Sequence, residues 1–441
     1  AAERLCHILS SSRYITDLLE DAPTSITWLD KVADLQPLSA GALKAEITSL
    51  LSRHEDSADA MRAVRYLRRR EILRIAMGDA LNLLSVQQVC TGLATVDECT
   101  IGAALALAER EEANVGERDE KTTPQKSDAP QRDSQEAAGE NPEEEQRNPL
   151  LTEITVIAMG RLGGAENGFG SDADVMFVHR PVEGADEGEA QTQANRIVNR
   201  LMQLIKQPVR PAIRAERPLE VDADLRPEGK QGALVRSLDS YRAYYERWAE
   251  TWEFQALLRA RPIAGSEDLG RAFVELIDPY RYPREFTVEQ AQQVRRMKAR
   301  VEHERMPHGA DRTRQLKLGR GGLSDVEWLV QLIQLQHAHE VEGLRTTSTL
   351  EALDAAVQAN LVAAEDAEVL RDAWLLATKI RGGNVLRGVR QSDLLPTLRD
   401  ALEAVARWSG YTPGSARQLE EDYLRATRNA RKVYERLFFE G

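Results

Sequence analysis

The chain has few aromatic residues, few cysteines and no long apolar run, and each shortage excludes a class of protein. Phe, Trp and Tyr make up 5% of the residues, and no stripe of interleaved basic and aromatic residues marks a binder of single-stranded nucleic acid. Cys6, Cys90 and Cys99 form no Cys-x-x-Cys pair, which argues against a disulfide framework and a cysteine zinc site. No run approaches the roughly 18 apolar residues of a membrane helix. We therefore expect a cytoplasmic protein with no membrane association.

The chain also lacks an excess of positive charge. Its formal net charge is −13, which argues against nucleic-acid binding driven by phosphate contacts. Residues 111–149 hold twelve acidic and five basic residues, so −7 of that charge is local. This segment has almost no large apolar residues and is rich in Glu, Gln, Pro and Ser, which predicts a disordered linker or surface insertion. An acidic docking tail is the alternative.

The length and the composition predict several units in which helix dominates. A chain of 441 residues exceeds one ordinary core, and Leu, Ala, Arg and Glu are prominent, as in mainly helical proteins. The start at Ala1 has neither a methionine nor a signal-peptide core, so we expect a piece of a longer protein. The expected fold class is α+β and mainly helical, with a small mixed sheet followed by a helical bundle.

Periodicity divides the chain into four regions. Apolar residues at helical spacing, strongest over 61–84, predict a helical subdomain over 1–110. The acidic segment 111–149 follows. Short β-branched runs then predict a catalytic domain over 150–270, and helix-start patterns predict a bundle over 271–441. On the first region, Arg68, Arg69 and Arg70 are interpreted as a solvated helix face.

Three strands and one helix are predicted in the catalytic region. Two apolar, β-branched runs at 154–159 and 174–179 flank a glycine-rich loop, and 191–206 is an amphipathic helix. The strict alternation of 219–225 predicts a third strand.

Capping boxes mark helix starts in the C-terminal region. They are predicted at Thr287/Gln290, Ser324/Glu327, Ser348/Glu351 and Ser415/Gln418. Helix ends are predicted at Asn360, Gly382–Gly383 and Gly410. Trp248 and Trp252, four apart on a predicted helix, are interpreted as core residues rather than an adenine stack.

The second strand begins with a pair of acids. Asp172 and Asp174 are two residues apart, so on a strand both carboxylates point to the same face. Magnesium prefers oxygen ligands and takes one or two carboxylates together with substrate phosphates. The pair therefore predicts a magnesium site.

The glycine-rich loop before these acids predicts a seat for phosphate. Glycines let backbone amides approach an anion closely, and Arg161 and Ser171 add donors. The candidate phosphate-binding residues of this loop are Gly160, Arg161, Gly163, Gly164 and Ser171.

A further carboxylate is expected from the third strand, because two-metal phosphoryl transfer needs one facing the first two. Glu220, Asp222 and Asp224 all fall on the polar face of 219–225. Alternation alone does not choose among them.

Together these residues resemble the nucleotidyltransferase fold of DNA polymerase β and the kanamycin nucleotidyltransferases. The shared signature is an apolar residue, Gly, then Gly or Ser, about ten residues, and Asp-apolar-Asp or Glu. This chain departs from it once, because Arg161 follows Gly160 where a small phosphate-contacting residue is usual.

The chain more closely resembles the glutamine synthetase adenylyltransferase family, which are bifunctional enzymes with two such domains. Beyond Gly160 and Asp172-x-Asp174, the resemblance rests on three blocks. These are Glu220-Val-Asp-Ala-Asp-Leu-Arg-Pro, Thr251-Trp-Glu-Phe-Gln-Ala and Gly321-Gly-Leu-Ser-Asp-Val-Glu-Trp. The last two blocks, and an end resembling a natural chain terminus, favour the C-terminal, adenylylating half.

The resemblance implies roles for specific residues. Asp222 matches the family position of the third metal ligand, whereas Asp224 stands where relatives often have arginine. Arg226 and Lys230 would neutralise phosphates, with a structural role as the equal alternative. Asp325 and Glu327 also lie in a family block, although the Ser324 capping box accounts for Glu327.

The implied reaction moves AMP from ATP to a tyrosine of glutamine synthetase. Asp172, Asp174 and Asp222 would hold two Mg²⁺ ions, for which Mn²⁺ could substitute, and Asp222 would accept the tyrosine proton. The family implies further that the reaction lowers glutamine synthetase activity in response to nitrogen status, through a PII-type signal protein and glutamine. The alternatives are the phosphorolytic, deadenylylating half and an inactive regulatory module.

Overall fold

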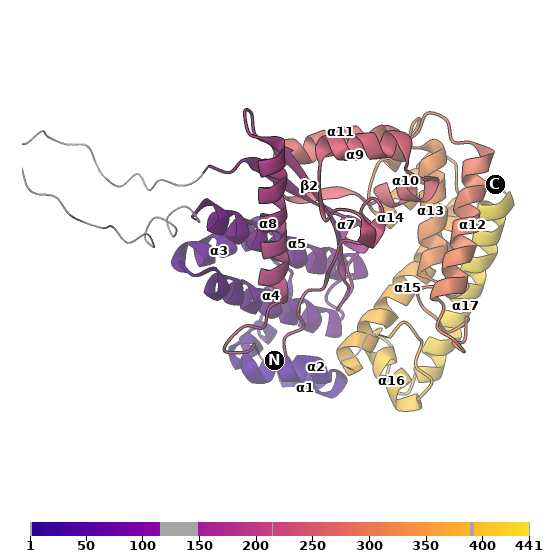
Figure 1. The fold of residues 1–441 in the computed structure, drawn as a ribbon. Coiled ribbons are helices and arrows are strands. Elements are labelled where there is room, and N and C mark those ends of the chain that lie inside the picture. The colour runs from indigo at the N-terminus through magenta and orange to yellow at the C-terminus, as the bar shows by residue number, and fades with distance from the viewer. Residues whose placement is uncertain (1, 115–148, 214, 389–391, 441) are drawn as a thin grey trace, which may run out of the picture.

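The computed structural model describes residues 2–114, 149–213, 215–388 and 392–440 of the chain. Helices dominate it, and a small mixed sheet lies between an N-terminal set of helices and a C-terminal bundle (Figure 1). The predicted fold class is therefore confirmed. Of the acidic segment, Glu111 and Glu112 belong to the end of a helix, where they pair with Arg200 and Arg196. Residues 115–148 lie outside the described part.

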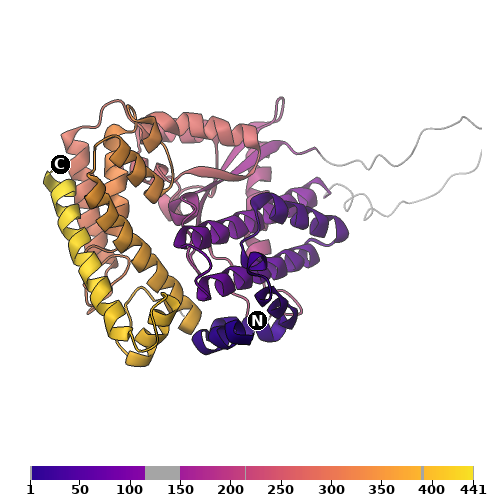
Figure 2. The same ribbon diagram turned by 180° about the vertical axis from the view of Figure 1, so that it is seen from behind.

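The N-terminal helices form a layered unit at one end of the molecule, indigo to purple in Figure 2. They are α1 (Ala2–Ser11), α2 (Arg13–Asp21), α3 (Ala40–Arg53), α4 (Ser57–Ala80) and α5 (Val86–Ala113). Two short 3₁₀ segments, Pro23–Leu29 and Val32–Leu35, connect α2 to α3. Serine or aspartate accepts a hydrogen bond from the backbone at the starts of α2, α3, α4 and α5, which satisfies otherwise unpaired amides.

The arginine run on α4 does not form the solvated face that was predicted. Arg69 is only 4% exposed and pairs with Asp21, while Arg68 pairs with Asp97 of α5. Arg70 binds Glu46 and Glu71. The prediction was wrong because α4 packs against α2, α3 and α5, so these guanidinium groups form ion pairs with carboxylates instead of facing water.

Helix α5 is the one helix in the described residues that is long and apolar enough to span a membrane by length and composition. Its most apolar window is 72% buried within the protein, as in the core helix of a globular protein. It packs on α3, α4, α8 (Glu187–Lys206) and the sheet. The protein interior accounts for its apolar character.

The sheet has five strands in the order β3-β2-β1-β5, with β4 also paired to β2. These strands are β1 (Thr152–Ala158), β2 (Ala173–Pro181), β3 (Val221–Asp222), β4 (Val235–Ser237) and β5 (Arg261–Gly265). Strand β1 is antiparallel to β2 and β5, whereas β2 is parallel to β3 and β4. The sheet is therefore mixed, as predicted.

The two faces of the sheet bury different sets of side chains. Ile154 and Val156 of β1 face a core shared with α4, α5 and α8. Ile157, the next residue after Val156, faces a second core with α9 (Leu238–Arg247) and α11 (Glu267–Arg281). This alternation at a period of two places helices on both faces of the sheet, whose central strands β1 and β2 are mostly buried (Figure 1).

The third strand is much shorter than the alternation of 219–225 predicted. Only Val221 and Asp222 pair with β2. The Asp222 side chain accepts a hydrogen bond from the Asp224 amide at 2.7 Å, which turns the chain away from the sheet. The Asp222 side chain therefore competes with strand pairing for the Asp224 amide. The alternation of polar and apolar residues in the sequence does not reveal this competition.

The C-terminal bundle consists of helices around the buried Trp374, Tyr423 and Tyr434. Its main members are α12 (Val288–Arg305), α13 (Leu323–His337), α14 (Thr349–Gln358), α15 (Ala364–Gly388), α16 (Arg399–Trp408) and α17 (Ala416–Glu435). Helix α15 packs on α13, α16 and α17, at the right of Figure 1. The short α10 (Thr251–Leu257) links this bundle to α11.

The predicted helix boundaries in this region are partly confirmed. The Thr287/Gln290 capping box is present, and Asn360 and Gly410 have positive φ angles just after helix ends. At Ser348 only the serine half of the box forms, and Ser415 makes no capping bond. Gly382 and Gly383 do not end a helix, because α15 continues to Gly388 and Gly383 packs closely against Trp408.

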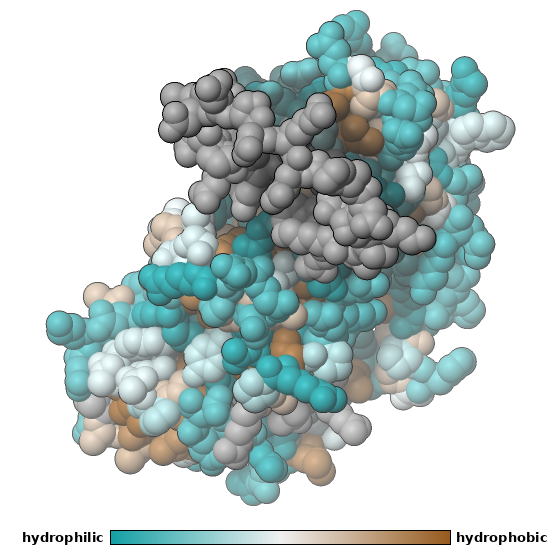
Figure 3. All heavy atoms as spheres, turned by 60° about the vertical axis from the view of Figure 1, so that its left-hand side comes forward, coloured by the Kyte–Doolittle hydropathy of each residue, from teal (hydrophilic) through white to brown (hydrophobic). Residues whose placement is uncertain are grey.

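The N-terminal helices and the bundle also contact each other directly. Asp79 of α4 accepts a hydrogen bond from Trp408 at 2.8 Å and forms an ion pair with Lys379 of α15. Ser12 donates to the carbonyl of Leu386 at 2.7 Å. On the face drawn in Figure 3, the coloured residues are mostly hydrophilic, with small, separate apolar patches. The division into four domains stays a prediction.

Candidate active site

Three aspartates meet where β2 and β3 lie side by side. Asp172 directly precedes β2, and Asp174, its second residue, is the register partner of Asp222 in β3. In a parallel pair, register partners occupy the same level of neighbouring strands. The structure therefore brings together the three carboxylates that the sequence analysis singled out.

The electrostatics show that these carboxylates repel one another. Burial, followed by the charges of Asp222 and Asp172, raises the pKa of Asp174 to about 6. Burial also raises the pKa of Asp172, with Asp222 and Glu220 as the next causes. Like charges held close together disfavour the ionised form, and a bound cation relieves this repulsion.

Gly160 is required by the position of Asp174. Its φ angle is +52°, and a Cβ atom at this residue would lie 2.2 Å from Oδ2 of Asp174. The neighbouring amide of Met159 donates to the Asp174 carbonyl at 2.8 Å. The glycine thus lets the loop after β1 rest directly against the central carboxylate.

Cations from the C-terminal bundle face these acids. Lys317 lowers the pKa of both Asp172 and Asp174, and Arg305 at the end of α12 acts on Asp174 as well. Lys317 and Arg305 are exposed and line a cavity of about 750 Å³ together with Arg300, Leu225 and Trp252. The acids lie beside this cavity rather than among its lining residues. A polyanion there would lie between the carboxylates and a cationic wall.

The glycine loop packs closely against Arg259, and its role as a phosphate seat stays a prediction. Gly160–Gly163 forms the short helix α7. A Cβ atom at Gly163 would lie 1.8 Å from the Arg259 carbonyl, and one at Gly164 would lie 2.3 Å from the Arg259 guanidinium. Both glycines therefore permit packing against Arg259. Ser171 accepts a hydrogen bond from the Gly168 amide and lies next to Asp172.

Arg161 extends away from the acids. Its Nε donates to the Glu166 carbonyl at 3.1 Å, and its guanidinium lies 3.8 Å from Glu327 and over the ring of Trp374. Helix α13 begins at Leu323, so Ser324 lies inside it and the predicted capping box does not form. Glu327 faces Arg161 instead. The sequence could not reveal this pair because its partners are far apart along the chain.

Arg226 and Lys230 lie around Asp224 rather than over the three acids. Lys230 is 3.2 Å and Arg226 is 3.8 Å from the Asp224 carboxylate, and Arg226 also donates to three backbone carbonyls of its own turn. Their phosphate role stays a prediction, and the contacts favour the structural alternative for Arg226.

Asp325 has a structural environment. Its side chain is fully buried and accepts hydrogen bonds from Lys298 at 2.8 Å, Arg431 at 2.9 Å and the Gly321 amide at 2.7 Å. These contacts fix the Lys317–Gly322 loop to α12, α13 and α17. The acid positions the loop that carries Lys317.

The sequence analysis assigned neither Arg305 nor Lys317 to the site. Lys317 was visible as part of a basic glycine loop before a helix, whereas Arg305 ends a helix with many charges and carries no local signal. Arg381 of α15 was missed as well. It acts on Asp172 and donates to Asp393, and burial and the nearby Arg161 lower its pKa.

The donor set fits a divalent metal ion. Carboxylate oxygens are the ligands that magnesium prefers, and the mutual repulsion of the three aspartates favours a cation. Across the described ranges, no three side chains of Asp, Glu, His or Cys lie close enough together to hold a metal ion on their own. Oxygens from a substrate would have to complete the coordination.

Comparison with known proteins supports this assignment of the fold. The sequence profile of the glutamate-ammonia ligase adenylyltransferase family matches residues 2–276, and that of the GlnD PII-uridylyltransferase family matches residues 295–438. The first match spans both the glycine loop and the three aspartates.

Individual relatives match along the whole chain. The bifunctional glutamine synthetase adenylyltransferase/adenylyl-removing enzyme of Leifsonia xyli is 42% identical over all of this chain and 39% of its own length. The proteins of the same name from Nocardia farcinica and Corynebacterium glutamicum are 44% and 43% identical over 99% of this chain, which covers 40% and 39% of their lengths. The chain thus spans about two fifths of these relatives. It belongs to the glutamate-ammonia ligase adenylyltransferase family.

Proposed function

We propose that this chain transfers AMP from ATP to a tyrosine of glutamine synthetase. The observation that carries the proposal is the placement of Asp172, Asp174 and Asp222 opposite Lys317 and Arg305, beside a cavity of about 750 Å³. Carboxylates that face cations across a cavity suit a nucleoside triphosphate, because both a metal ion and basic groups are needed to neutralise its negative charge. The name of the relatives supplies the protein substrate.

Each group of residues has a distinct role in this proposal. Lys317 and Arg305 hold the phosphates of ATP, with the loop around Lys317 fixed by Asp325. Gly160 keeps Asp174 in place, and Asp222 completes the carboxylate set from the neighbouring strand. The tyrosine hydroxyl approaches the α-phosphorus from the carboxylate side, where Asp222 accepts its proton.

Metal ions bound by the three carboxylates would lower the pKa of the attacking hydroxyl and neutralise charge on the departing pyrophosphate. Mg²⁺ is the proposed ion, and Mn²⁺ has the same preference for oxygen ligands. The fit rests on the carboxylate donors and on their raised pKa values.

The direction of the reaction is also part of the proposal. The relatives are named for both adenylylation and removal of the adenylyl group. The adenylylating direction is supported by the resemblance of Thr251-Trp-Glu-Phe-Gln-Ala and of Ser324-Asp325 to the C-terminal family half. In this direction the chain would lower glutamine synthetase activity in response to nitrogen status, signalled by a PII-type protein.

Labelled ATP tests both the reaction and its direction. Glutamine synthetase is incubated with the chain, Mg²⁺ and ATP labelled at either the α- or the γ-phosphate. We expect the α-label on the protein and the γ-label in pyrophosphate. Label released as orthophosphate would contradict nucleotidyl transfer, and formation of ADP from adenylylated glutamine synthetase in phosphate, without forward transfer, would assign the phosphorolytic direction instead.

A further inference from the structure

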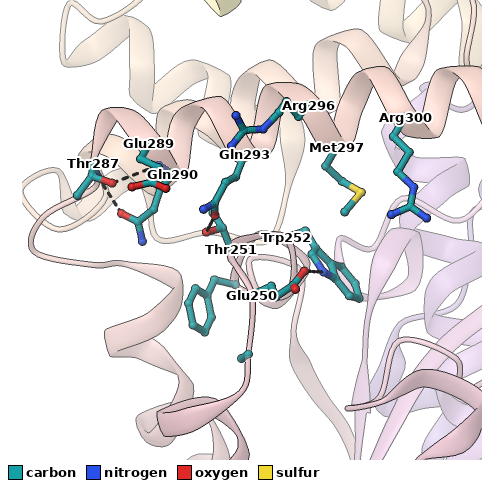
Figure 4. A pocket seen from close by; sticks show the side chains of 12 residues that line it. Glu250, Thr251, Trp252, Thr287, Glu289, Gln290, Gln293, Arg296, Met297 and Arg300 are labelled. Carbon is teal, nitrogen blue, oxygen red and sulfur yellow. Dashed lines mark hydrogen bonds between the residues drawn. The ribbon is translucent and has the colours of Figure 1, made fainter.

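A second groove adjoins the catalytic cavity along helix α12. It encloses about 700 Å³ between this helix and the segment from Ala249 to Phe254, which includes the start of α10. Figure 4 shows Gln293, Met297 and Arg300 of α12 on one side, with Thr251 and Trp252 on the other. Trp252, Met297 and Arg300 line the catalytic cavity as well, so the two hollows are continuous.

One face of α12 forms the wall common to both hollows. It runs from Thr287 through Gln290, Gln293, Met297 and Arg300 to Glu304. At 1.5 Å per residue this wall is roughly 25 Å long. An extended peptide rises about 3.3 Å per residue, so roughly eight residues would cover the wall.

The lining suits a polypeptide better than a charged small molecule. The amide oxygens of Gln290 and Gln293 already accept hydrogen bonds from the Thr287 amide and the Thr251 hydroxyl, so their NH2 groups are the ones that can donate to the carbonyls of a peptide. Met297 with Trp252 offers apolar contact. Glu250 and Glu289 balance Arg296 and Arg300, so neither sign dominates. This balance disfavours a polyanion in the groove.

An exposed tryptophan stands next to the groove. Trp248 directly precedes Ala249 of the lining and is 74% exposed, which corrects its interpretation as a core residue. Trp252 is half-buried, and its indole donates to Glu250 at 2.9 Å. Tryptophan and arginine are the residues most enriched among the energetic centres of protein interfaces.

We propose that this groove, with Trp248 at its edge, binds the stretch of glutamine synthetase that flanks the modified tyrosine, in an extended conformation. The inference rests on the proposed function and adds the surface that selects the protein substrate. Because the groove is continuous with the catalytic cavity, a segment that lies along α12 would bring its tyrosine toward the acids.

Kinetics with two exposed residues outside the catalytic cavity test the inference. We expect Trp248→Ala and Arg296→Ala each to raise KM for glutamine synthetase about tenfold, on the scale of an interface centre, while KM for ATP stays unchanged. Leu398→Ala is the matched control, since Leu398 is 73% exposed and lies outside the lining of the groove. Unchanged thermal melting would show that all variants are folded.

A photo-crosslinking amino acid at Gln293 identifies the occupant directly. We expect crosslinks to residues flanking the modified tyrosine. Crosslinks to a second copy of the chain or to a distant surface would overturn the inference, as would unchanged KM values in both groove variants. If the wild-type chain transfers no AMP at all, the proposed function fails and the inference falls with it.

Discussion

Asp222 and Asp224 are two residues apart on the same polar face, yet the structure gives them different neighbours. Asp222 is the register partner of Asp174, whereas the Asp224 carboxylate lies 3.2 Å from Lys230 and faces away from the ladder. The difference arises because the chain turns after Asp222, whose side chain accepts a hydrogen bond from the Asp224 amide. Alternation alone could not separate the two acids.

The first prediction compares these acids. Asp222→Asn should lower the rate of AMP transfer by about 10² to 10³, as expected when a group that stabilises transition-state charge is lost. Asp224→Asn should cost less than tenfold because Lys230 is solvated. The rates are measured at saturating Mg-ATP after circular dichroism has shown folded variants. An inactive Asp224→Asn beside an active Asp222→Asn would reverse the assignment.

A second prediction concerns Gly160. Gly160→Ala places a Cβ atom 2.2 Å from the Asp174 carboxylate and strains a φ angle of +52°. We expect about 100-fold slower transfer, because displacing a catalytic group by about 1 Å has this scale of effect. Gly184→Ala has a similar positive φ but meets no atom within 4 Å, so it controls for backbone strain. Equal rates for the two variants would show that the contact with Asp174 is unimportant.

A third prediction separates nucleotide binding from chemistry. Lys317→Met should weaken ATP binding at least tenfold by isothermal titration calorimetry, because the variant removes a cation that faces Asp172 and Asp174. Arg320→Met is the control, as Arg320 lies in the same loop, is exposed and is absent from the cavity lining. Equal affinities for both variants would remove Lys317 from the phosphate site.

At the scale of elements, the strands and helices that follow local rules were predictable, and those set by distant partners were not. The runs before and after the glycine loop became β1 and β2, and Thr287 caps α12. The predicted start of α13 was wrong because the Ser324 hydroxyl accepts a hydrogen bond from Lys298 and does not cap the helix. Likewise, Gly382–Gly383 does not end a helix. The missing side chain of Gly383 instead leaves room for Trp408 to pack against α15.

The buried ion network of α13 gives a stability prediction. Asp325→Asn leaves Lys298 and Arg431 facing a neutral group, and we expect a loss of about 3 kcal/mol in the free energy of unfolding. Asp239→Asn, in an exposed pair with Arg242, should change it by less than about 0.5 kcal/mol. Urea denaturation measures both. Equal stabilities would mean that the network contributes little.

Glu109 in α5 predicts a pH dependence of stability. Burial raises its pKa from 4.5 to about 7, so the folded state resists its ionisation. Its favourable contribution is complete below pH 4.5 and is lost as the pH rises through about 7. Glu109→Gln should therefore stabilise the protein at about pH 8, by at most about 3 kcal/mol, and have little effect near pH 4. An effect independent of pH would contradict a buried carboxyl.

At the scale of the whole molecule, the site combines residues of the sheet with residues of the C-terminal bundle. The carboxylates come from the sheet, whereas Lys317, Arg305 and Arg381 come from the C-terminal bundle. The sequence could supply the acids, because their spacing is local, and a resemblance to a family. It could not supply the cationic wall, since only the folded chain brings Arg305 of α12 and Arg381 of α15 near the aspartates.

The most direct test of the central claim is tandem mass spectrometry of glutamine synthetase after incubation with this chain and Mg-ATP. Wild-type chain is compared with Asp174→Asn, in which the central carboxylate becomes neutral. The account predicts an adenylyl group on a tyrosine with the wild type and almost none with the variant. Unmodified tyrosines with the wild type, or equal modification by both, would contradict it.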